Sequence, residues 1–460
     1  MSSFTSLAQI VGAQLPVVEG QLYQVQTKEI QLGRGGLSAL GAMAARHFSP
    51  GHVLLLADTH TFPLAGSAVR RALAHAGFAV SVLQLQDGHD GKVEADDSTL
   101  DEVEMALDAL PEPRAGVIAL GAGTINDLAK LPAFRKGLPY GVVPTAASMN
   151  GYTSAIAAIL SGGVKRTIAC APPRFVLCDL DLVASAPLEL ARSGLGDLLS
   201  KPVSSGDWRL SHHLLGEPFY ALPVVMVESA FKQTQAVAEG IGRGDPEALA
   251  PLMEALLISG ISMASAGSSS PASGGEHLLS HLWDMTASYR NRAVGLHGAQ
   301  VGVATQVTAT LYQKLKAFKP GPHAVAEALE RLVPFEQYQS RLSSLPEGLI
   351  PAVVVESKKK YPSPETLKRR LEQVVNGWDG LWGDLSGWLQ QPASLRQVLE
   401  AAGAPATIGG IGISEVELRE AYRIARDIRA RYSVLDLAWE LGQLDALEDE
   451  VLTESGVLRG

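Results

Sequence analysis

Almost continuously apolar runs alternate with stretches of helical periodicity over about the first 190 residues, and this alternation limits the possible folds more than any other feature. Such runs are typical of strands that are covered on both faces, as in a parallel sheet. With the helical stretches between them, for example Ala65–Ala76 and Leu100–Leu110, they predict a doubly wound, Rossmann-like α/β domain. The predicted strands are His52–Asp58, Ala79–Leu85, Ala115–Gly121, Tyr140–Pro144 and Phe175–Asp179.

The strand signal fades after about Pro187, and helical patterns follow. A chain of 460 residues is too long for one core, so we expect a sheet domain at residues 1–187 and an all-helical domain at residues 188–460. Two irregular regions are predicted within the second domain, at Ser265–Glu276 and Gly377–Pro392. The predicted helices are Ser229–Glu239, Pro246–Gly260, His277–Ala287, Gln300–Lys316, Ala324–Leu332, Ser363–Val375, Ser394–Ala402 and Ser414–Arg431.

Composition and charge exclude several classes of protein. With 48 acidic against 38 basic residues the net charge is −10, and without a strong basic patch nucleic acid is not an expected partner. The two cysteines, Cys170 and Cys178, are too few for a disulfide framework and fit a reducing cytoplasm. Met1–Gly20 lacks the pattern of a signal peptide. The uncharged stretch between Lys136 and Lys165 contains prolines and glycines, so we expect a cytoplasmic protein with no membrane span.

A turn containing glycine follows the third predicted strand. It has the sequence GAGTIND, Gly121–Asp127, and runs into a helix. Glycine there lets the backbone approach a ligand closely, and the N–H groups that open the helix favour a phosphate. The full G-x-G-x-x-G fingerprint is absent, so the motif alone is a weak sign of dinucleotide binding. Asp58 ends the first predicted strand, where it either accepts hydrogen bonds from a ribose or acts as a turn residue.

Histidines mark a second group of candidate residues in the helical part. His277 and His281 in GGEHLLSH are four residues apart and therefore share one helix face. His297 stands at a predicted helix start in LHGAQVG, and Asp197 closes the turn GLGD. A carboxylate and imidazoles without thiolates suit Zn²⁺, Fe²⁺ or Ni²⁺ and leave a position for substrate. The adjacent pair His212 and His213 point in different directions and are predicted to be structural.

Seven segments share their order and rough spacing with one enzyme family: GAGTINDLAK, VPTAASMNGYTS, CDLDL, GLGD, GGEHLLSH, LHGAQVG and RYSVLDLAWELG. Over about Val53 to Leu441 the chain resembles the sn-glycerol-1-phosphate dehydrogenases, in particular their bacterial branch. These belong to the superfamily of iron-containing alcohol dehydrogenases and dehydroquinate synthases. The resemblance implies a dehydroquinate synthase-like fold, with a Rossmann-like sheet domain followed by an all-α domain that binds metal and substrate. It also implies a metal-dependent, NAD(P)-linked interconversion of sn-glycerol 1-phosphate and dihydroxyacetone phosphate by hydride transfer.

The resemblance further implies which residues form the site. One divalent metal, with zinc expected and nickel or iron as alternatives, would be bound by Asp197, His277 and His297. His281 matches a histidine that contacts substrate, and Asp58 matches a ribose-binding position that favours NAD over NADP. The implied cofactor-binding residues are Asp58, Gly121, Gly123, Thr124, Asn126, Asp127, Thr145, Ser148 and Ser154.

One position departs from the family pattern. Where the family has an aspartate that contacts substrate, in the run T-A-x-S-M-D-G-Y, this chain has Asn150. An amide keeps an acceptor oxygen but loses the charge and the ability to take up a proton. Asn150 is therefore a candidate catalytic position, together with His281 and Asp197, and it leaves the identity of the substrate open.

Other activities remain as alternatives. They are a dehydrogenase of an unphosphorylated polyol or another polyol phosphate, a carbon–oxygen lyase of the dehydroquinate synthase kind, and a non-catalytic relative. The lyases carry an N-x-x-H-T-x-G-H pattern that GGEHLLSH lacks. The expected partner is a small molecule, and we expect a homodimer because relatives commonly pair. Candidate phosphate-binding residues are Lys165, Arg166, Lys201, Arg290 and Arg292.

Overall fold

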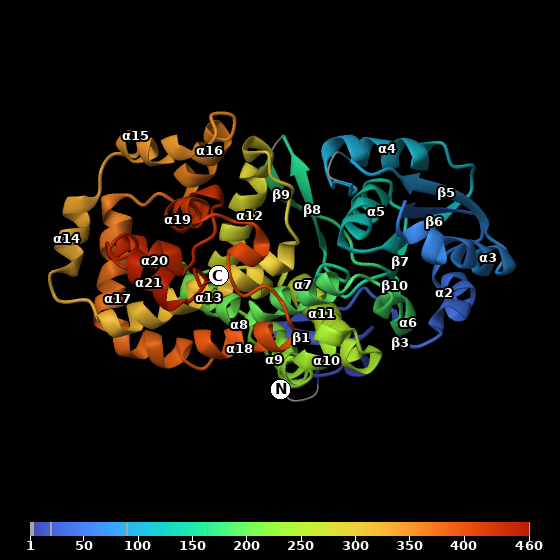
Figure 1. Ribbon diagram of the computed structural model, residues 1–460, viewed down its shortest axis with the longest axis horizontal. Helices are drawn as coiled ribbons and strands as arrows, with labels where there is room; N and C mark the ends of the chain where they lie inside the picture. Colours follow the sequence, from blue (N-terminus) through green and yellow to red (C-terminus); the bar gives the residue numbers. More distant parts are fainter. Residues whose placement is uncertain (1–3, 19–20, 89–90, 163, 460) are drawn as a thin grey trace. The chain divides into compact units, whose positions relative to one another are not determined.

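The five predicted strands lie in one six-stranded sheet in which every pair of neighbouring strands is parallel (Figure 1). The structure is a computed structural model that describes residues 4–18, 21–88, 91–162 and 164–459. The strand order is β3-β10-β7-β6-β4-β5. The strands are β3 (Glu29–Gly33), β4 (His52–Asp58), β5 (Ala79–Leu85), β6 (Arg114–Gly121), β7 (Tyr140–Pro144) and β10 (Phe175–Asp179).

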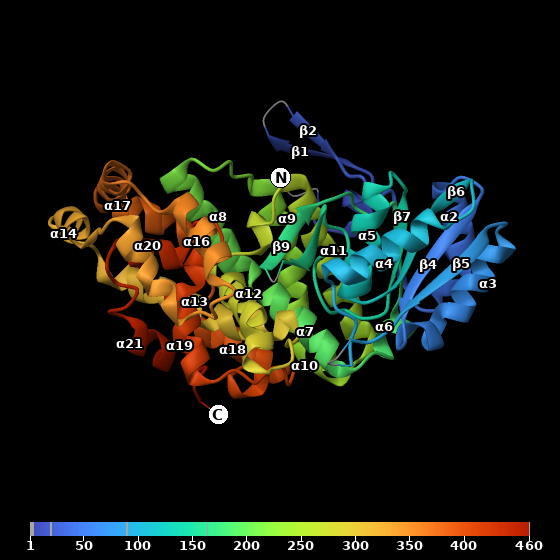
Figure 2. The same ribbon diagram turned by 90° about the horizontal axis from the view of Figure 1, so that it is seen from above.

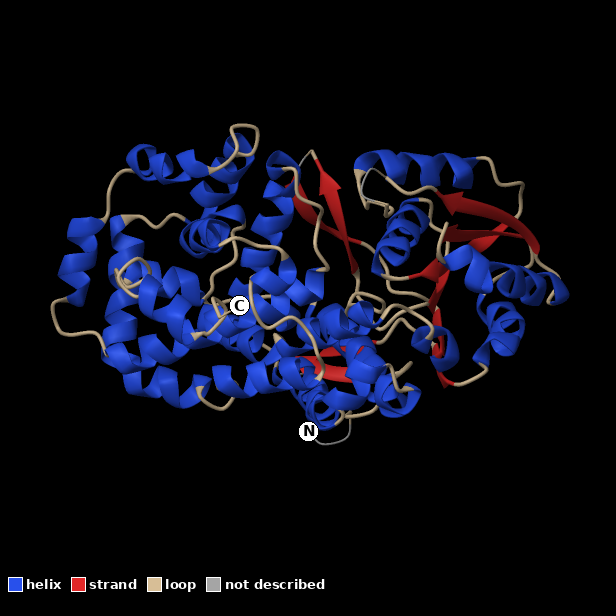
Figure 3. Ribbon diagram, viewed as in Figure 1, coloured by secondary structure: helices blue, strands red, loops and turns tan. Residues whose placement is uncertain are grey.

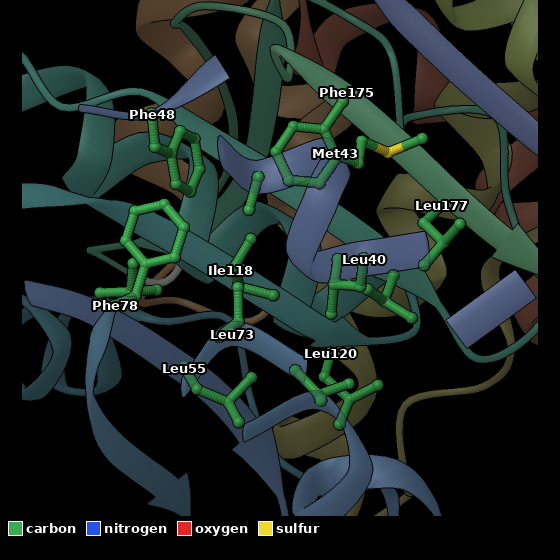
Figure 4. Close-up of a cluster of buried hydrophobic side chains, with 14 of the residues drawn as sticks. Leu40, Met43, Phe48, Leu55, Leu73, Phe78, Ile118, Leu120, Phe175 and Leu177 are labelled. Atoms are coloured by element: carbon green, nitrogen blue, oxygen red, sulfur yellow. The ribbon is translucent and has the colours of Figure 1, made fainter. Parts of the chain in front are cut away.

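Helices cover both faces of the sheet, which explains why its central strands are apolar at nearly every position. On one face, α2 (Leu40–His47) and α3 (Ser67–His75) pack against alternate strand residues such as Leu55 (Figure 4). On the other face lie α4 (Asp97–Asp108) and α5 (Gly123–Arg135). The doubly wound arrangement predicted from the sequence is therefore confirmed.

Three strand features were not predicted. The edge strand β3 is half-buried at every position and pairs with β10, which lies far along the chain. Two antiparallel hairpins stand outside the sheet, β1 (Gln14–Val18) with β2 (Gln21–Gln24) and β8 (Ile156–Ser161) with β9 (Val164–Ala169). In Figure 2 the β1–β2 hairpin lies beside α9 (Ala221–Ala236), and β1 also contacts α11 (Pro246–Ala266).

The sheet and hairpins belong to the first of two units, Met1–Leu198 with Tyr220–Ser269. This unit includes α11 (Pro246–Ala266), which is long and apolar enough to cross a membrane. However, 83% of its most apolar stretch is buried inside the structure, and the helix packs against α9. The other helices of this unit are α1 (Leu7–Ile10), α6 (Leu180–Ala184), α7 (Leu188–Leu199), α9 (Ala221–Ala236) and α10 (Ala238–Arg243).

The second unit, Leu199–Phe219 with Ser270–Gly460, contains no strand among its described residues, and all the red arrows of Figure 3 belong to the first unit. A parallel-sheet part followed by a helical part is the predicted fold class. The α-helices of the second unit are α8 (Lys201–Leu215), α12 (Gly275–Ala287), α13 (His297–Phe318), α14 (Ala324–Arg331), α15 (Phe335–Tyr338), α16 (Ile350–Lys360), α17 (Pro364–Leu385), α18 (Pro392–Ala401), α19 (Glu415–Ile424), α20 (Val434–Glu440) and α21 (Glu448–Glu454).

One prediction about this unit is wrong. Gly377–Pro392 was expected to be irregular, but α17 continues through most of it, to Leu385. The residues Trp378, Leu381, Trp382 and Leu385 follow helical spacing and are all buried, whereas Gly377, Gly380 and Gly383 have no neighbouring atom within 4 Å of an added Cβ. Each glycine costs a helix about 1 kcal/mol, and burial of large apolar side chains on the opposite face outweighs that cost.

Candidate cofactor and metal site

The glycine turn lies between β6 and α5, as predicted. A Cβ on Gly121 would come within 2.5 Å of the Ile125 Cβ, and one on Gly123 within 2.8 Å of the Met149 Cγ, so neither position has room for a side chain. Gly123 and Thr124 are half-buried, and the helix has no side-chain cap. The first N–H groups of α5 are thus placed to meet an anion, as in a dinucleotide-binding turn.

Asn126, Asp127 and Ser154 face the protein interior. The Asp127 carboxylate accepts hydrogen bonds from Asn126 Nδ2 at 2.9 Å, from Lys130 Nζ at 3.3 Å and from the backbone N–H of Ala158 at 2.9 Å. The Lys130 ammonium also donates to Ser154 Oγ at 3.2 Å. These bonds tie α5 to β8 behind the glycine turn, and direct contact of the three residues with a cofactor stays a prediction.

Thr145 and Ser148 lie in the loop that follows β7. The Thr145 N–H donates to the carbonyl of Gly121 at 3.2 Å, which fixes the start of this loop beside the glycine turn. Ser148 is half-buried, and its hydroxyl lies 3.4 Å from the Tyr152 hydroxyl. The structure therefore brings Thr145 to the glycine turn.

Asp58 organises the turn at the end of β4. Its Oδ1 accepts hydrogen bonds from the N–H of His60 at 3.0 Å, the N–H of Thr61 at 2.6 Å and the Thr61 hydroxyl at 2.8 Å. Asp58 therefore acts as a turn residue, which is one of the two roles considered from the sequence. Binding of a ribose by Asp58 stays a prediction.

Three histidines gather where α12 and α13 meet. His277 and His281 lie one turn apart on α12, which is buried along its whole length, and His297 is the first residue of α13. The ring centroids are 5.1 Å apart for His277 and His297, 5.6 Å for His281 and His297, and 6.1 Å for His277 and His281. The spacing predicted from the sequence therefore produces one cluster of imidazoles.

Hydrogen bonds at Nδ1 set the orientation of two of these rings. Nδ1 of His277 lies 2.8 Å from Glu276 Oε1. Nδ1 of His297 lies 3.2 Å from Ser280 Oγ, and the Ser280 hydroxyl donates to Gln300 Oε1 at 2.8 Å. Because a carboxylate can only accept, the His277 ring carries its proton on Nδ1 and its lone pair on Nε2. The Ser280 hydroxyl holds the His297 ring through the corresponding nitrogen.

Asp197 is buried near the end of α7. The segment GLGD was expected to be a turn, but all four of its residues lie within this helix. Its Oδ2 accepts a hydrogen bond from the backbone N–H of Asn150 at 3.0 Å, and its Oδ1 accepts one from Asn150 Nδ2 at 3.2 Å. Asn150, the position that departs from the family pattern, thus contacts a predicted metal ligand directly. Ligand atoms of Asp197, His277 and His297 all lie within 4.8 Å of one another.

These residues fit a divalent cation by their chemistry. Two imidazoles and one carboxylate are the nitrogen and oxygen donors of a catalytic zinc-type site, which keeps a coordination position open. Hydrogen bonds from Nδ1 to a carboxylate or hydroxyl are the usual support of metal-binding histidines. We conclude that Asp197, His277 and His297 form a possible metal site.

Glu276, Ser280 and Gln300 were not predicted from the sequence as site residues. Glu276 directly precedes a predicted ligand at the start of a helix, so its place in GGEH was a usable signal. The roles of Ser280 and Gln300 depend on the crossing of α12 and α13, which the sequence pattern does not define.

Asp207 is a second buried carboxyl near the start of α12. It accepts hydrogen bonds from Gly275 N–H at 2.7 Å, Val434 N–H at 2.7 Å and the Tyr312 hydroxyl at 2.5 Å. Burial, helped by the nearby charge of Glu276, raises the pKa of Asp207 to about 7. The carboxyl anchors the turn that leads into the histidine helix.

The candidate phosphate-binding residues fall into three groups. Lys201 is buried, and its ammonium donates to the carbonyl of Ala272 at 2.9 Å. Arg290 and Arg292 form ion pairs with Glu417, and Arg290 also pairs with Glu420. Lys165 and Arg166 lie on β9, half-buried and exposed respectively.

Comparison with known proteins places these features in a family context. A family model of iron-containing alcohol dehydrogenases matches residues 31–187. The protein named glycerol-1-phosphate dehydrogenase (NAD(P)+) from Bacillus subtilis is 31% identical over 409 residues, which are 88% of this chain and 90% of that protein. Its namesake from Thermococcus kodakarensis is 33% identical over 286 residues, 62% of this chain and 78% of that protein.

Solved structures agree on the fold. The crystal structure of glycerol dehydrogenase from Schizosaccharomyces pombe matches with a TM-score of 0.57 at 18% sequence identity, over 93% of this chain and 91% of that chain. At that identity the likeness concerns the fold alone.

Proposed function

The chain belongs to the glycerol-1-phosphate dehydrogenase family of the iron-containing alcohol dehydrogenases and is an NAD(P)-dependent alcohol dehydrogenase, and we propose that it interconverts sn-glycerol 1-phosphate and dihydroxyacetone phosphate. In the oxidative direction the C2 carbinol loses a hydride to NAD(P)+ and its hydroxyl proton to the protein or solvent. The substrate proposal follows the names of the relatives, which match over most of this chain.

One observation carries the proposal: a carboxylate and two imidazoles, Asp197, His277 and His297, offer ligand atoms within 4.8 Å of one another. A divalent metal bound there would act as a Lewis acid on the C2 oxygen, which favours both alcohol oxidation and ketone reduction. Zinc is the metal we propose, because the donors are nitrogen and oxygen without thiolate and zinc needs no redox change for this role. Nickel and iron accept the same donors.

The chain's own side chains would orient the substrate and move the proton. His281 lies one turn from His277, with its ring stacked on His297 at 5.6 Å, so we propose that it holds a substrate hydroxyl or relays the proton. Asn150 hydrogen-bonds both oxygens of Asp197 and would hold that carboxylate in place. Because an amide cannot take up a proton, proton transfer falls to His281 in this mechanism.

Cofactor binding is proposed at the glycine turn. The uncapped first turn of α5 around Gly123 and Thr124 would accept the pyrophosphate, and Thr145, hydrogen-bonded to Gly121, lies beside it. Asp58 at the end of β4 would place a negative charge near the adenosine ribose, so we propose NAD as the better cofactor and NADP as the weaker one. Asn126, Asp127 and Ser154 would support this turn through their internal hydrogen bonds.

The substrate is tested by comparing ketones that differ only in the phosphate. The full-length, zinc-loaded enzyme is assayed with NADH and either dihydroxyacetone phosphate or dihydroxyacetone. We expect NADH oxidation with the phosphorylated ketone and at least tenfold lower kcat/KM with the unphosphorylated one, a difference of about 1.4 kcal/mol in transition-state binding. Equal kcat/KM for the two ketones would reject the phosphorylated substrate.

A second candidate function is supported by Asn150. Because this residue replaces a family aspartate that contacts substrate, a different polyol or polyol phosphate is the alternative substrate. A panel of unphosphorylated polyols with NAD distinguishes it, since activity on one of them above that on glycerol 1-phosphate would favour this alternative.

A further inference from the structure

Glu276 is a buried carboxylate beside a proposed metal ligand. It is 0% exposed, and its Oε1 accepts two hydrogen bonds, from His277 Nδ1 at 2.8 Å and from the backbone N–H of Gly274 at 2.7 Å. Among the described residues, its one ion-pair partner is the same histidine. Among the side chains of the described residues, His277 is the one that hydrogen-bonds this carboxylate.

Burial of the second oxygen of this carboxylate opposes folding. Glu276 Oε2 is buried and makes no hydrogen bond within the described structure. Leaving a buried carboxylate oxygen without a donor is costly, and such groups in native structures call for a functional explanation. The hydrogen bond to His277 supplies that explanation.

The turn before α12 holds Glu276 in this position. A Cβ on Gly274 would lie 2.4 Å from Asp207 Oδ2 and 2.9 Å from Glu276 Oε2, so only glycine fits there. The N–H of Gly275 donates to Asp207 Oδ2 at 2.7 Å. The N–H groups of Gly274 and Gly275 thus hold both carboxyl groups at the start of α12.

We propose that Glu276 is a positioning residue that holds His277 as the Nδ1–H tautomer and makes its Nε2 a stronger metal donor. The inference rests on the proposed function, because it places a metal at His277. A carboxylate acceptor raises the basicity of the opposite ring nitrogen more than a neutral acceptor does. His297 has the neutral Ser280 hydroxyl in the corresponding place, so the two histidines are supported unequally.

The test is the metal affinity of full-length variants, measured with zinc and a competing chelator. Removing such a supporting group typically weakens metal binding about 10- to 100-fold, and we expect that loss for Glu276→Gln. We expect a smaller loss for Ser280→Ala. The matched control is Glu448→Gln, a buried glutamate paired with Arg419 and Arg423, whose affinity for zinc should equal that of the wild type. Cobalt substitution gives a second readout, because the visible absorption of bound Co²⁺ should change in Glu276→Gln and not in Glu448→Gln.

If Glu276→Gln does not fold, the proposal is tested on the wild-type protein. In the zinc-loaded chain labelled with ¹⁵N-histidine, we expect His277 to carry a proton on Nδ1 that is hydrogen-bonded to a carboxylate. A proton on Nε2 of His277 would overturn the proposal, as would zinc affinity of Glu276→Gln within twofold of the wild type. Zinc retained by His277→Ala would instead reject the proposed function, so the two failures are distinguishable.

Discussion

Each proposed metal ligand is fixed by a hydrogen bond from or to a neighbouring side chain. Asn150 donates to Asp197, His277 donates to Glu276, and Nδ1 of His297 is hydrogen-bonded to the Ser280 hydroxyl. Such bonds restrict the side-chain rotamers before any ion binds, which lowers the entropy lost on binding. The chemistry of the site therefore depends on single residues whose removal has separable effects.

Removal of a metal ligand should remove metal and activity together. For His277→Ala and His297→Ala we expect zinc affinity to fall by at least about 100-fold, because losing a ligand costs more than losing its support. Zinc content by elemental analysis and NADH oxidation with dihydroxyacetone phosphate check this expectation. Full zinc content and full turnover in His297→Ala would reject the ligand assignment.

A change in turnover is expected for Asn150→Asp. The new carboxylate would face Asp197 at hydrogen-bond distance, replacing a donor with a like charge, so we expect kcat/KM to change by about tenfold without loss of fold. Asn376→Asp adds the same charge at an exposed position of α17 and is the control. Unchanged kinetics with every substrate would mean that position 150 does not distinguish this enzyme from its relatives.

Secondary-structure elements differ in how far the sequence predicts them. The strands β4, β5, β6, β7 and β10 follow the predicted ranges closely because strands buried on both faces need a continuous apolar run. The edge strand β3 escapes prediction, since its residues are half-buried and its pairing with β10 is a long-range contact. The glycines on the exposed face of α17 lower the local helix propensity, so the sequence predicted an irregular segment there. Propensity does not include the burial of the tryptophans on the other face, which stabilises the helix.

The sequence likewise predicted only some of the residues of the candidate site. Sequence spacing identified the histidines of α12 and α13, and the glycine turn stands where β6 meets α5. Ser280 and Gln300 escaped prediction because their roles arise from side chains that meet between α12 and α13. Glu276 was missed although it directly precedes His277 in the sequence. Periodicity determines the face on which a residue lies, but not its neighbour from another element.

The close packing of α7 against the loop after β7 leads to a prediction about these two segments. A Cβ on Gly194 would lie 1.9 Å from the carbonyl oxygen of Ala147, so Gly194→Ala must push the two apart. We expect a loss of about 1–3 kcal/mol of stability and weaker zinc binding, because Asn150 and Asp197 are carried by these two segments. Urea unfolding and zinc affinity measure both effects.

Gly383→Ala is the control for this substitution. Gly383 lies in α17 with nothing within 4 Å of an added Cβ, so alanine there should raise stability by up to about 1 kcal/mol. Equal stability of Gly194→Ala and the wild type would contradict the close packing.

At the scale of the whole molecule, the chain passes between its two units more often than the strand pattern suggests. The fading of the strand signal placed a boundary at residue 187, whereas Tyr220–Ser269 groups with the sheet and Leu199–Phe219 with the later helices. Helical periodicity is the same in both units, so the sequence pattern does not show to which unit a helix belongs. Contacts between distant segments decide it.

The pH dependence of stability provides a prediction for the fold as a whole. Asp207 has an ordinary pKa of 3.8 when unfolded, and burial raises the pKa to about 7 in the folded chain. Between these values the folded chain binds the additional proton, so this group's contribution decreases as pH rises from about 4 to 7. Asp207→Asn should remove up to about 1.4 kcal/mol per pH unit of this slope. Urea unfolding in chelator from pH 4.5 to 7.5 tests this, and an unchanged slope would contradict it.

The proposed chemistry requires one divalent ion bound by Asp197, His277 and His297. Anomalous diffraction from crystals of the zinc-loaded full-length protein tests this directly. We predict one zinc peak per chain at bonding distance, about 2.0–2.2 Å, from the Asp197 carboxylate and from Nε2 of both histidines. A zinc peak at other residues, or none at these three in a protein that reduces dihydroxyacetone phosphate, would contradict the account.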